Sequence, residues 1–223
     1  MGAASGLSST KQRCMSTLSR AVRAGTRGRR IVDAATALFD SRSYAATTME
    51  AIAEHADAAV ETVYSRFRTK VNLLDAILEP AIVRTADGHD LFDRPEIAEI
   101  AEIRQCPEQR TQVRMLAHFS RGILERTAVA HRILLSAAAS DPRAAELQRR
   151  DAQRRRDGQR VYIDMLLANG PLRDGLDAAD AAAAYSALSN PHTYTLLVRE
   201  QAWTADKFEQ WLRDSLTLLL LGD

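Results

Sequence analysis

Apolar residues recur along this chain at the three- and four-residue spacing of amphipathic helices. In the stretch 31–39, isoleucine, alanine, leucine and phenylalanine fall on one face of such a helix. Two shorter runs, 49–53 and 60–67, repeat the spacing after polar breaks, and no later stretch alternates as a half-buried strand does. Longer runs follow over 71–78, 115–135, 178–199 and 204–220. The pattern predicts an all-α protein.

Several of these helices carry recognisable start signals. Thr47-Thr48-Met49-Glu50 is typical of a capping box, in which the Thr47 hydroxyl accepts a backbone N–H and Glu50 reaches back. The other predicted starts are Thr69, Asp93-Arg94-Pro95, Asp141-Pro142 and Thr204.

Pro191 lies inside the run 178–199, which otherwise predicts one long helix. Proline has no N–H to donate to the carbonyl of Ala187, so we expect a kink at this position. A kink leaves a polar backbone group beside Asn190, and such a group needs a partner, either water or a ligand.

Composition narrows the class of protein. The 223 residues are 46% hydrophobic and 26% charged, as in an average globular protein. The two cysteines, Cys14 and Cys106, form no disulfide framework, and no apolar run reaches the 18 residues of a membrane span. We therefore expect a cytoplasmic protein with free thiols, no membrane contact, no metal and no cofactor.

Charge is distributed unevenly. The first 70 residues carry eleven basic and six acidic side chains, whereas the remaining 153 carry 19 basic and 23 acidic ones. A basic N-terminal segment followed by an acidic remainder indicates that the N-terminal segment binds a polyanion. Residues 1–24 lack apolar periodicity and are expected to form a disordered basic arm. The arginine-rich run 149–156 is balanced by Asp151, Asp157 and Asp164, which predicts a solvated face.

Three predicted helices occupy residues 27–67, and the last two are short and joined by a tight turn. This order is typical of a helix-turn-helix, which places its second helix in the DNA major groove. A small helical hairpin without DNA binding fits the spacing equally well. Within 60–67, the expected inward set is Val63, Phe67 and the ring of Tyr64. The expected outward set is Glu61, Thr62, Ser65 and Arg66.

An ordered set of residues between Thr26 and Leu78 carries a more specific signal. The set is Arg29-Arg30-Ile31-Val32-Asp33-Ala34-Ala35, Leu38-Phe39, Tyr44, Thr47-Thr48-Met49, Ile52-Ala53, Thr62-Val63-Tyr64, Phe67, Lys70 and Leu73-Leu74. It resembles the N-terminal domain of the TetR family of bacterial transcriptional regulators. The resemblance implies a three-helix DNA-binding domain over 25–70 and a helical regulatory and dimerisation domain over 71–223. Residues 189–212 resemble regulatory domains of one branch of that family more weakly.

The resemblance also implies which residues meet DNA. Thr47 and Thr48, at a helix N-terminus, would bind phosphate, and Lys70 would reach a second backbone phosphate. The full set of DNA-binding residues that we expect is Arg27, Arg29, Thr47, Thr48, Val60, Glu61, Thr62, Tyr64, Ser65, Arg66 and Lys70.

The turn before the second short helix departs from the family pattern. It reads Asp57-Ala58-Ala59 where the family usually has Gly-Val-Ser, so the serine cap is missing unless Asp57 replaces it. Glu61 brings a negative charge that would repel phosphate or accept from a cytosine amino group. Both departures bear on operator identity more than on the fold.

For the rest of the chain, the resemblance implies a homodimer built on the last two helices and an effector cavity among the central ones. The alanine-rich stretch 178–187 allows close helix approach, and the run 216–221 is too apolar for an exposed end. Plain core packing explains part of the expected lining equally well. That lining is Met115, His118, Phe119, Ile123, His131, Leu135, Tyr185, Asn190 and Tyr194.

These observations predict a ligand-responsive transcriptional regulator, a repressor that binds a palindromic double-stranded DNA operator as a dimer. Its effector would be a small molecule of unknown identity. A helical enzyme is an alternative, although the sequence has no GxSxG, P-loop, GxGxxG, HExxH or CxxC motif. A helical protein-interaction module is the other alternative, and it leaves the acid-free basic arm beside the helix-turn-helix unexplained.

Overall fold

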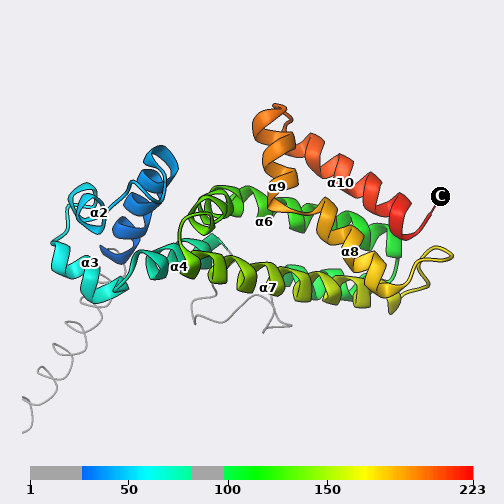
Figure 1. The fold of residues 1–223 in the computed structure, drawn as a ribbon. Helices are drawn as coiled ribbons and strands as arrows, with labels where there is room; N and C mark the ends of the chain where they lie inside the picture. Colours follow the sequence, from blue (N-terminus) through cyan, green and yellow to red (C-terminus); the bar gives the residue numbers. More distant parts are fainter. Residues whose placement is uncertain (1–26, 82–97, 223) are drawn as a thin grey trace, which may run out of the picture. The chain divides into compact units, whose positions relative to one another are not determined.

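The structure, a computed structural model, describes residues 27–81 and 98–222 of the chain. All regular structure in these ranges is helical, which confirms the predicted all-α class (Figure 1). The chain forms two compact units, the first ending at Leu73 and the second beginning at Leu74. The predicted arm over 1–24 and the predicted helix start at 93–95 lie outside the described residues.

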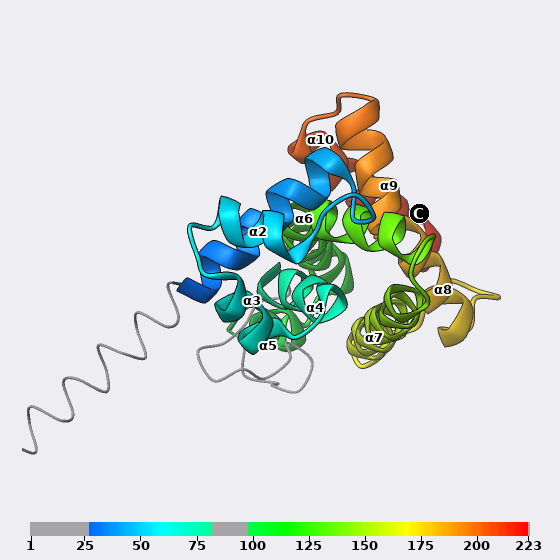
Figure 2. The ribbon, with the colours of Figure 1, turned by 60° about the vertical axis from the view of Figure 1, so that its left-hand side comes forward.

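The described part of the first unit contains a helix that includes residues 27–42 and is followed by α2 (Met49–His55) and α3 (Val60–Phe67). These helices are coloured blue to cyan in Figure 2. The apolar stripes that the sequence predicts are buried in all three helices. Ile31, Ile52 and Val63 are fully inaccessible to solvent, and Leu38 is 4% exposed. Burial of these faces, and not helix propensity, stabilises helices as short as α2 and α3.

The cap of α2 lies one residue later than predicted. The Thr48 hydroxyl accepts from the backbone N–H of Ala51 at 3.2 Å. Thr47 is buried, and its hydroxyl donates to the carbonyl of Ser43 at 2.8 Å and lies 3.3 Å from that of Leu38. The capping role predicted for Thr47 is therefore wrong, because its hydroxyl is engaged with the segment that precedes α2.

The next helix, α4 (Lys70–Ala81), begins in the first unit and continues into the second. Its cap is the predicted one, since the Thr69 hydroxyl accepts from the N–H of Asn72 at 3.1 Å. The apolar stripe of α4 is buried at Leu74, Ile77 and Leu78.

The second unit consists of one more short helix, two long helices and a set of shorter ones at the C-terminal end. These are α5 (Ala98–Gln105), α6 (Gln109–Ala138), α7 (Pro142–Leu167), α8 (Ala178–Leu188), α9 (Pro191–Tyr194), the π-helical turn η1 (Thr195–Glu200) and α10 (Ala205–Leu220). Helix α6 lies beside α7 and α10, and α8 packs on both α7 and α10 (Figure 1). In the core, the Tyr162 ring contacts the rings of Phe119 and Tyr185.

Two start signals in this unit are confirmed. The Asp141 carboxylate caps α7 by accepting from the N–H of Arg143 at 2.9 Å, with Pro142 in the first turn. Thr204 caps α10 by accepting from the N–H of Lys207 at 3.1 Å. The first N–H groups of a helix have no acceptor within the helix. Proline suits this position because it has no N–H, and a side-chain oxygen cap suits it because it accepts one of these hydrogen bonds.

The run 178–199 is not one kinked helix, as the sequence suggested, but two helices and a π-turn. Helix α8 ends at Leu188, and α9 begins at Pro191 with Asn190 as its cap, accepting from the N–H of His192 at 2.9 Å. The carbonyl of Ala187 accepts from the Thr193 hydroxyl at 3.0 Å. Pro191 has no N–H to donate to this carbonyl, and the Thr193 hydroxyl donates to it instead, beyond the break between the two helices.

Within the described ranges, none of the helices combines the length and hydropathy that crossing a bilayer requires.

Candidate nucleic-acid interface and effector pocket

The turn between α2 and α3 is held by an arginine that the sequence reasoning overlooked. Arg30, on the first helix, donates to the carbonyl of Ala56 at 2.7 Å and pairs with the carboxylate of Asp57 at 3.1 Å. Asp57 has a positive φ of 48°, and Ala59, the N-cap residue of α3, makes no side-chain capping hydrogen bond. Asp57 therefore does not replace the missing serine; the turn is held from outside by Arg30.

Helix α3 buries Val63 and Phe67 and presents the rest of its surface to solvent. Glu61, Ser65 and Arg66 are exposed, as predicted. The side chain of Arg66 lies against Gly28 of the first helix. Val60 and Thr62 are half-buried.

Tyr64 is not an inward residue. It is 42% exposed, and its hydroxyl donates to the Glu50 carboxylate at 3.0 Å. A backbone hydrogen bond, and then the Tyr64 hydroxyl, lower the pKa of Glu50, while the same contact raises the pKa of Tyr64. The prediction failed because the turn of α3 that carries Tyr64 faces the start of α2, where a carboxylate and not the core is the neighbour.

Lys70 supports the entry to α2. Its ammonium donates to the carbonyls of Tyr44 and Thr47 at 2.8 and 3.0 Å and lies 4.3 Å from the centre of the Tyr44 ring. These contacts fix the loop that places Thr48 at the exposed start of α2. Thr47 itself is 2% exposed, so of the two threonines only Thr48 offers its side chain to solvent.

Arg27 and Arg29 lie on the first helix, at the beginning of the described residues, and both are exposed. Neither arginine forms an ion pair with another residue of the described ranges. Their charge is therefore available to an external anion.

In the second unit, a pocket of about 370 Å³ opens between α6, α7 and the α9–η1 segment. Of the predicted effector residues, His131, Leu135 and Asn190 line it. A neighbouring cavity of about 50 Å³ continues between α6, α7 and α8 and is lined by Ile123 and Tyr185. Arg155 and Pro191 border both spaces.

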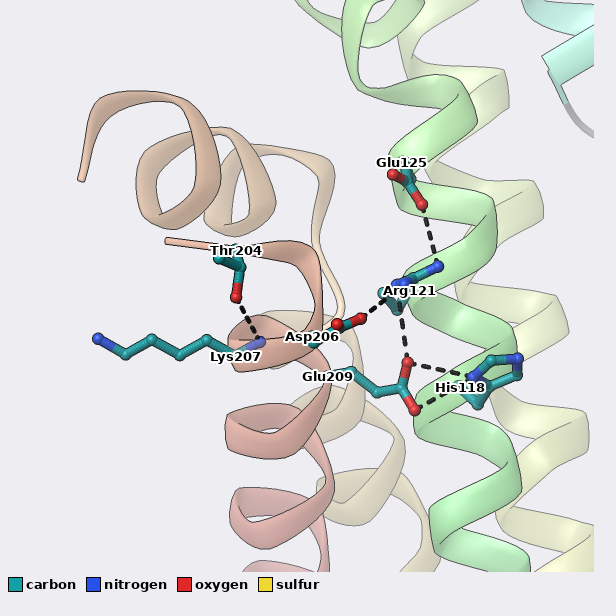
Figure 3. A network of polar contacts seen from close by, with 7 residues as sticks. All are labelled: His118, Arg121, Glu125, Thr204, Asp206, Lys207 and Glu209. Carbon is teal, nitrogen blue, oxygen red and sulfur yellow. Dashed lines mark hydrogen bonds and ion pairs between the residues drawn. The ribbon is translucent and has the colours of Figure 1, made fainter. Parts of the chain in front are cut away.

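The other predicted effector residues line neither space. Phe119 and Tyr194 are buried among core side chains, and Met115 packs partly buried against the same core. His118 faces outward, with its Nδ1 3.1 Å from both carboxylate oxygens of Glu209 on α10. Figure 3 shows this histidine in a network that Arg121 extends. The network ties α6 to α10.

The pocket also contains polar residues that the sequence reasoning misplaced. Asp151 was expected on a solvated face, but it is 2% exposed. Its Oδ2 lies 3.0 Å from Nε2 of His131 and 3.1 Å from Nε of Arg155. Burial acts to raise the pKa of Asp151, and the contacts with His131 and Arg155 outweigh it, so the pKa lies below its usual value. The signal was in the sequence, since Asp151 is four residues from Leu147 on the buried face of α7.

A helix-turn-helix with an exposed second helix is the arrangement with which many DNA-binding proteins enter the major groove. Residues 31–77 match the sequence model of the family described as bacterial regulatory proteins, tetR family. The match covers the helix-turn-helix and the start of α4, and the rest of the chain lies outside it. A comparison with curated proteins found no match.

Solved structures with the same fold extend over both units. SmeT in complex with triclosan is 22% identical, with a TM-score of 0.67 over 89% of this chain and 93% of its own. A TetR family transcriptional regulator from Pseudomonas syringae pv. tomato is 21% identical, with a TM-score of 0.59 over 87% and 94%. A protein from Saccharomonospora viridis, described as a transcriptional regulator in complex with choline, is 20% identical, with a TM-score of 0.63 over 88% and 98%. At these identities the likeness establishes the fold.

Proposed function

We propose that this protein is a ligand-responsive repressor that binds a palindromic DNA operator as a homodimer. The observation that carries the proposal is the surface of the first unit, where exposed α3 side chains, Thr48, Arg27 and Arg29 are all open to solvent. Phosphate contacts from such arginine and threonine side chains fix position on the duplex, and side chains of α3 read base edges.

The DNA-binding residues fall into two groups with different expected effects. Arg29 has no partner among the described residues and is a phosphate contact, whereas Glu61 lies on the first turn of α3 and is a base contact. Lys70 supports Thr48 through the loop that it holds. The resemblance to the family's DNA contacts supports these roles.

The dimer is proposed to form through α8 and α10. The outer face of α8 is a row of small exposed residues, Ala179, Ala183 and Ala187, spaced by four. On α10, Leu218 is 57% exposed although the helix is otherwise amphipathic. Small residues allow two helices to approach closely, and an exposed leucine gains from being covered.

The pocket between α6, α7 and α9 supports a small-molecule effector. SmeT and the Saccharomonospora viridis protein are described in complex with triclosan and choline, respectively. An effector releases DNA only if it binds the DNA-incompetent conformation better, and a preference of 1–3 kcal/mol gives roughly 5–150-fold coupling.

The test is a gel shift of the full chain on the DNA upstream of its own gene, at several salt concentrations. Arg29→Ala should weaken binding to every sequence alike and reduce the salt slope by about 0.9, one phosphate's worth. Glu61→Ala should change the preference at one base position. Arg104→Ala, an exposed arginine of the second unit, is the matched control and should change nothing. Uniform losses from Glu61→Ala and Arg29→Ala alike would contradict the assignment of Glu61.

A further inference from the structure

Charged side chains follow the exposed edge that helices α6 and α10 share. The two helices run antiparallel, because the first turn of α6 contacts Gly222, beyond the end of α10, and Arg121 contacts the first turn of α10. Around that first turn, Arg121 lies 2.9 Å from Asp206 and 3.6 Å from Glu209 (Figure 3). At this end of the edge, a cation of α6 therefore faces carboxylates of α10.

At the other end of the edge, arginines of both helices surround a pocket of about 420 Å³. Arg110 and Arg114 come from the first two turns of α6, and Arg213 comes from α10. One carboxylate, that of Asp214, lines the same pocket, so the charges of the lining side chains sum to +2. The rest of the lining is Thr217, Leu218 and Gly222.

Two of these arginines donate to neutral groups. Arg110 donates to the carbonyl of Gly222 at 3.3 Å, and Arg114 donates to the hydroxyl of Thr111 at 2.9 Å. Neither forms an ion pair with another residue of the described ranges. Their charges are therefore not neutralised by a direct carboxylate contact.

The carboxylates of Asp214 and Glu108 also belong to this end of the edge. The Asp214 carboxylate is 2.8 Å from Arg213 and 60% exposed. The Glu108 carboxylate caps α6 by accepting from the N–H groups of Arg110 and Thr111, and it does not line the pocket. The pocket thus keeps an excess of positive charge.

Three guanidinium groups around one pocket repel one another, and arginine stays protonated in proteins, so only a bound anion relieves the repulsion. Guanidinium groups bind carboxylates and phosphates through paired N–H donors. A phosphate ester carries a charge of about −1.5 to −2 and three acceptor oxygens. These match the net charge of the pocket and its three arginines, whereas a carboxylate offers one charge and two oxygens.

Leu218 adds an apolar surface to the lining, and its side chain is 57% exposed. An organic group attached to the phosphate would cover it. The volume of the pocket falls within the range of roughly 300–1,000 Å³ of small-molecule sites. The same leucine belongs to the proposed dimer surface, so carboxylates of a second copy are the competing occupant of the pocket.

We propose that the pocket between the start of α6 and the end of α10 binds the phosphate group of a small molecule, with Arg110, Arg114 and Arg213 as the donors. The bound phosphate would join α6 to the end of α10. The site is separate from the pocket between α6, α7 and α9 and does not depend on the proposed DNA binding.

The experiment is isothermal titration of the full chain, at low ionic strength, with ligands that differ in one feature. Phenyl phosphate is the dianion, phenyl sulfate has the same shape with a single charge, and phenol has no anionic group. Phenyl phosphate should bind at least tenfold more tightly than phenyl sulfate, because the second charge is attracted by the net charge of +2, and phenol should not bind. Equal affinities for the two anions, or no binding of phenyl phosphate, would overturn the proposal.

Inorganic phosphate distinguishes the two sources of the phosphate group. If it binds as tightly as phenyl phosphate, the ligand is the free ion. If it binds at least tenfold more weakly, the ligand is an ester whose organic part contacts Leu218. Either result supports a phosphate site.

Arg114→Gln tests the site directly and should weaken phenyl phosphate at least tenfold. The matched control is Arg104→Gln, at an exposed arginine of α5 outside the pocket, which should change nothing. Asp214→Asn removes the carboxylate from the lining and should tighten phenyl phosphate at least threefold. A misfolded variant cannot bind more tightly, so this gain keeps the test decisive. Unchanged affinity in both Arg114→Gln and Asp214→Asn would overturn the proposal.

Two further measurements test the competing occupants. Arg29→Ala, in the first unit, should leave the affinity for phenyl phosphate unchanged. A tenfold loss would place the ligand on the DNA-binding surface and overturn the proposal. Arg114→Gln should also leave the mass in sedimentation unchanged. Dissociation of a dimer by this variant, with unchanged affinity for phenyl phosphate, would assign the pocket to carboxylates of the second copy and overturn the proposal.

Discussion

Replacing Thr127 with valine should stabilise the protein. Thr127 is 1% exposed, its hydroxyl has no partner among the described residues, and the side chain lies inside α6. Valine has nearly the same shape and is also β-branched, so neither packing nor helix propensity changes much. The substitution removes a buried hydroxyl whose desolvation is uncompensated, a cost of about 1–3 kcal/mol.

Urea unfolding followed by tryptophan fluorescence measures this gain. Both tryptophans of the chain, Trp203 and Trp211, lie in the second unit, so their signal reports the unit that contains Thr127. The matched control is Thr217→Val on α10. Its hydroxyl donates to the carbonyl of Arg213 at 2.8 Å, so this variant should gain nothing.

The opposite result would be informative. If Thr127→Val lowered the free energy of unfolding by about 1 kcal/mol, the hydroxyl must have a partner, such as a water molecule in the 50 Å³ cavity. The inference that the Thr127 hydroxyl is buried without a partner would then be wrong.

Three further predictions concern stability and DNA binding. The pKa of Asp151 in the folded protein lies below its unfolded value of about 3.9, so its contribution to stability is present above about pH 4 and is lost as the pH falls further. In Asp151→Asn, the free energy of unfolding measured against pH should lack this loss. Thr204→Ala should lower the free energy of unfolding by about 1 kcal/mol in urea titrations, because α10 loses its cap. Arg30→Ala should weaken operator binding in gel shifts, because the turn before α3 loses its support; unchanged affinity would contradict that role.

Periodicity predicted the helices well because their apolar faces are buried almost without exception. The stripes through Ile31, Ile52 and Val63 became the buried faces of three helices. Local caps were predictable where a short polar residue directly precedes an apolar run, as at Thr69 and Thr204.

Contacts between distant residues were not predictable in this way. Arg30 reaches a turn 26 residues later, and no local pattern in the sequence marks that contact. The break before Pro191 depends on Thr193 replacing the lost donor, which only three-dimensional geometry reveals. Asp151 was assigned to a solvated face because its arginine neighbours dominate the local composition, whereas its position on the helix face decides its burial.

The most direct test of the central claim is a footprint of the full chain on operator DNA. A homodimer on a palindromic operator should protect two equivalent patches related by a two-fold axis, with centres about one helical turn, roughly 34 Å, or a multiple of it apart. An effector that binds the pocket between α6, α7 and α9 should remove both patches together. A single unsymmetrical patch, or protection that no pocket ligand alters, would contradict the account.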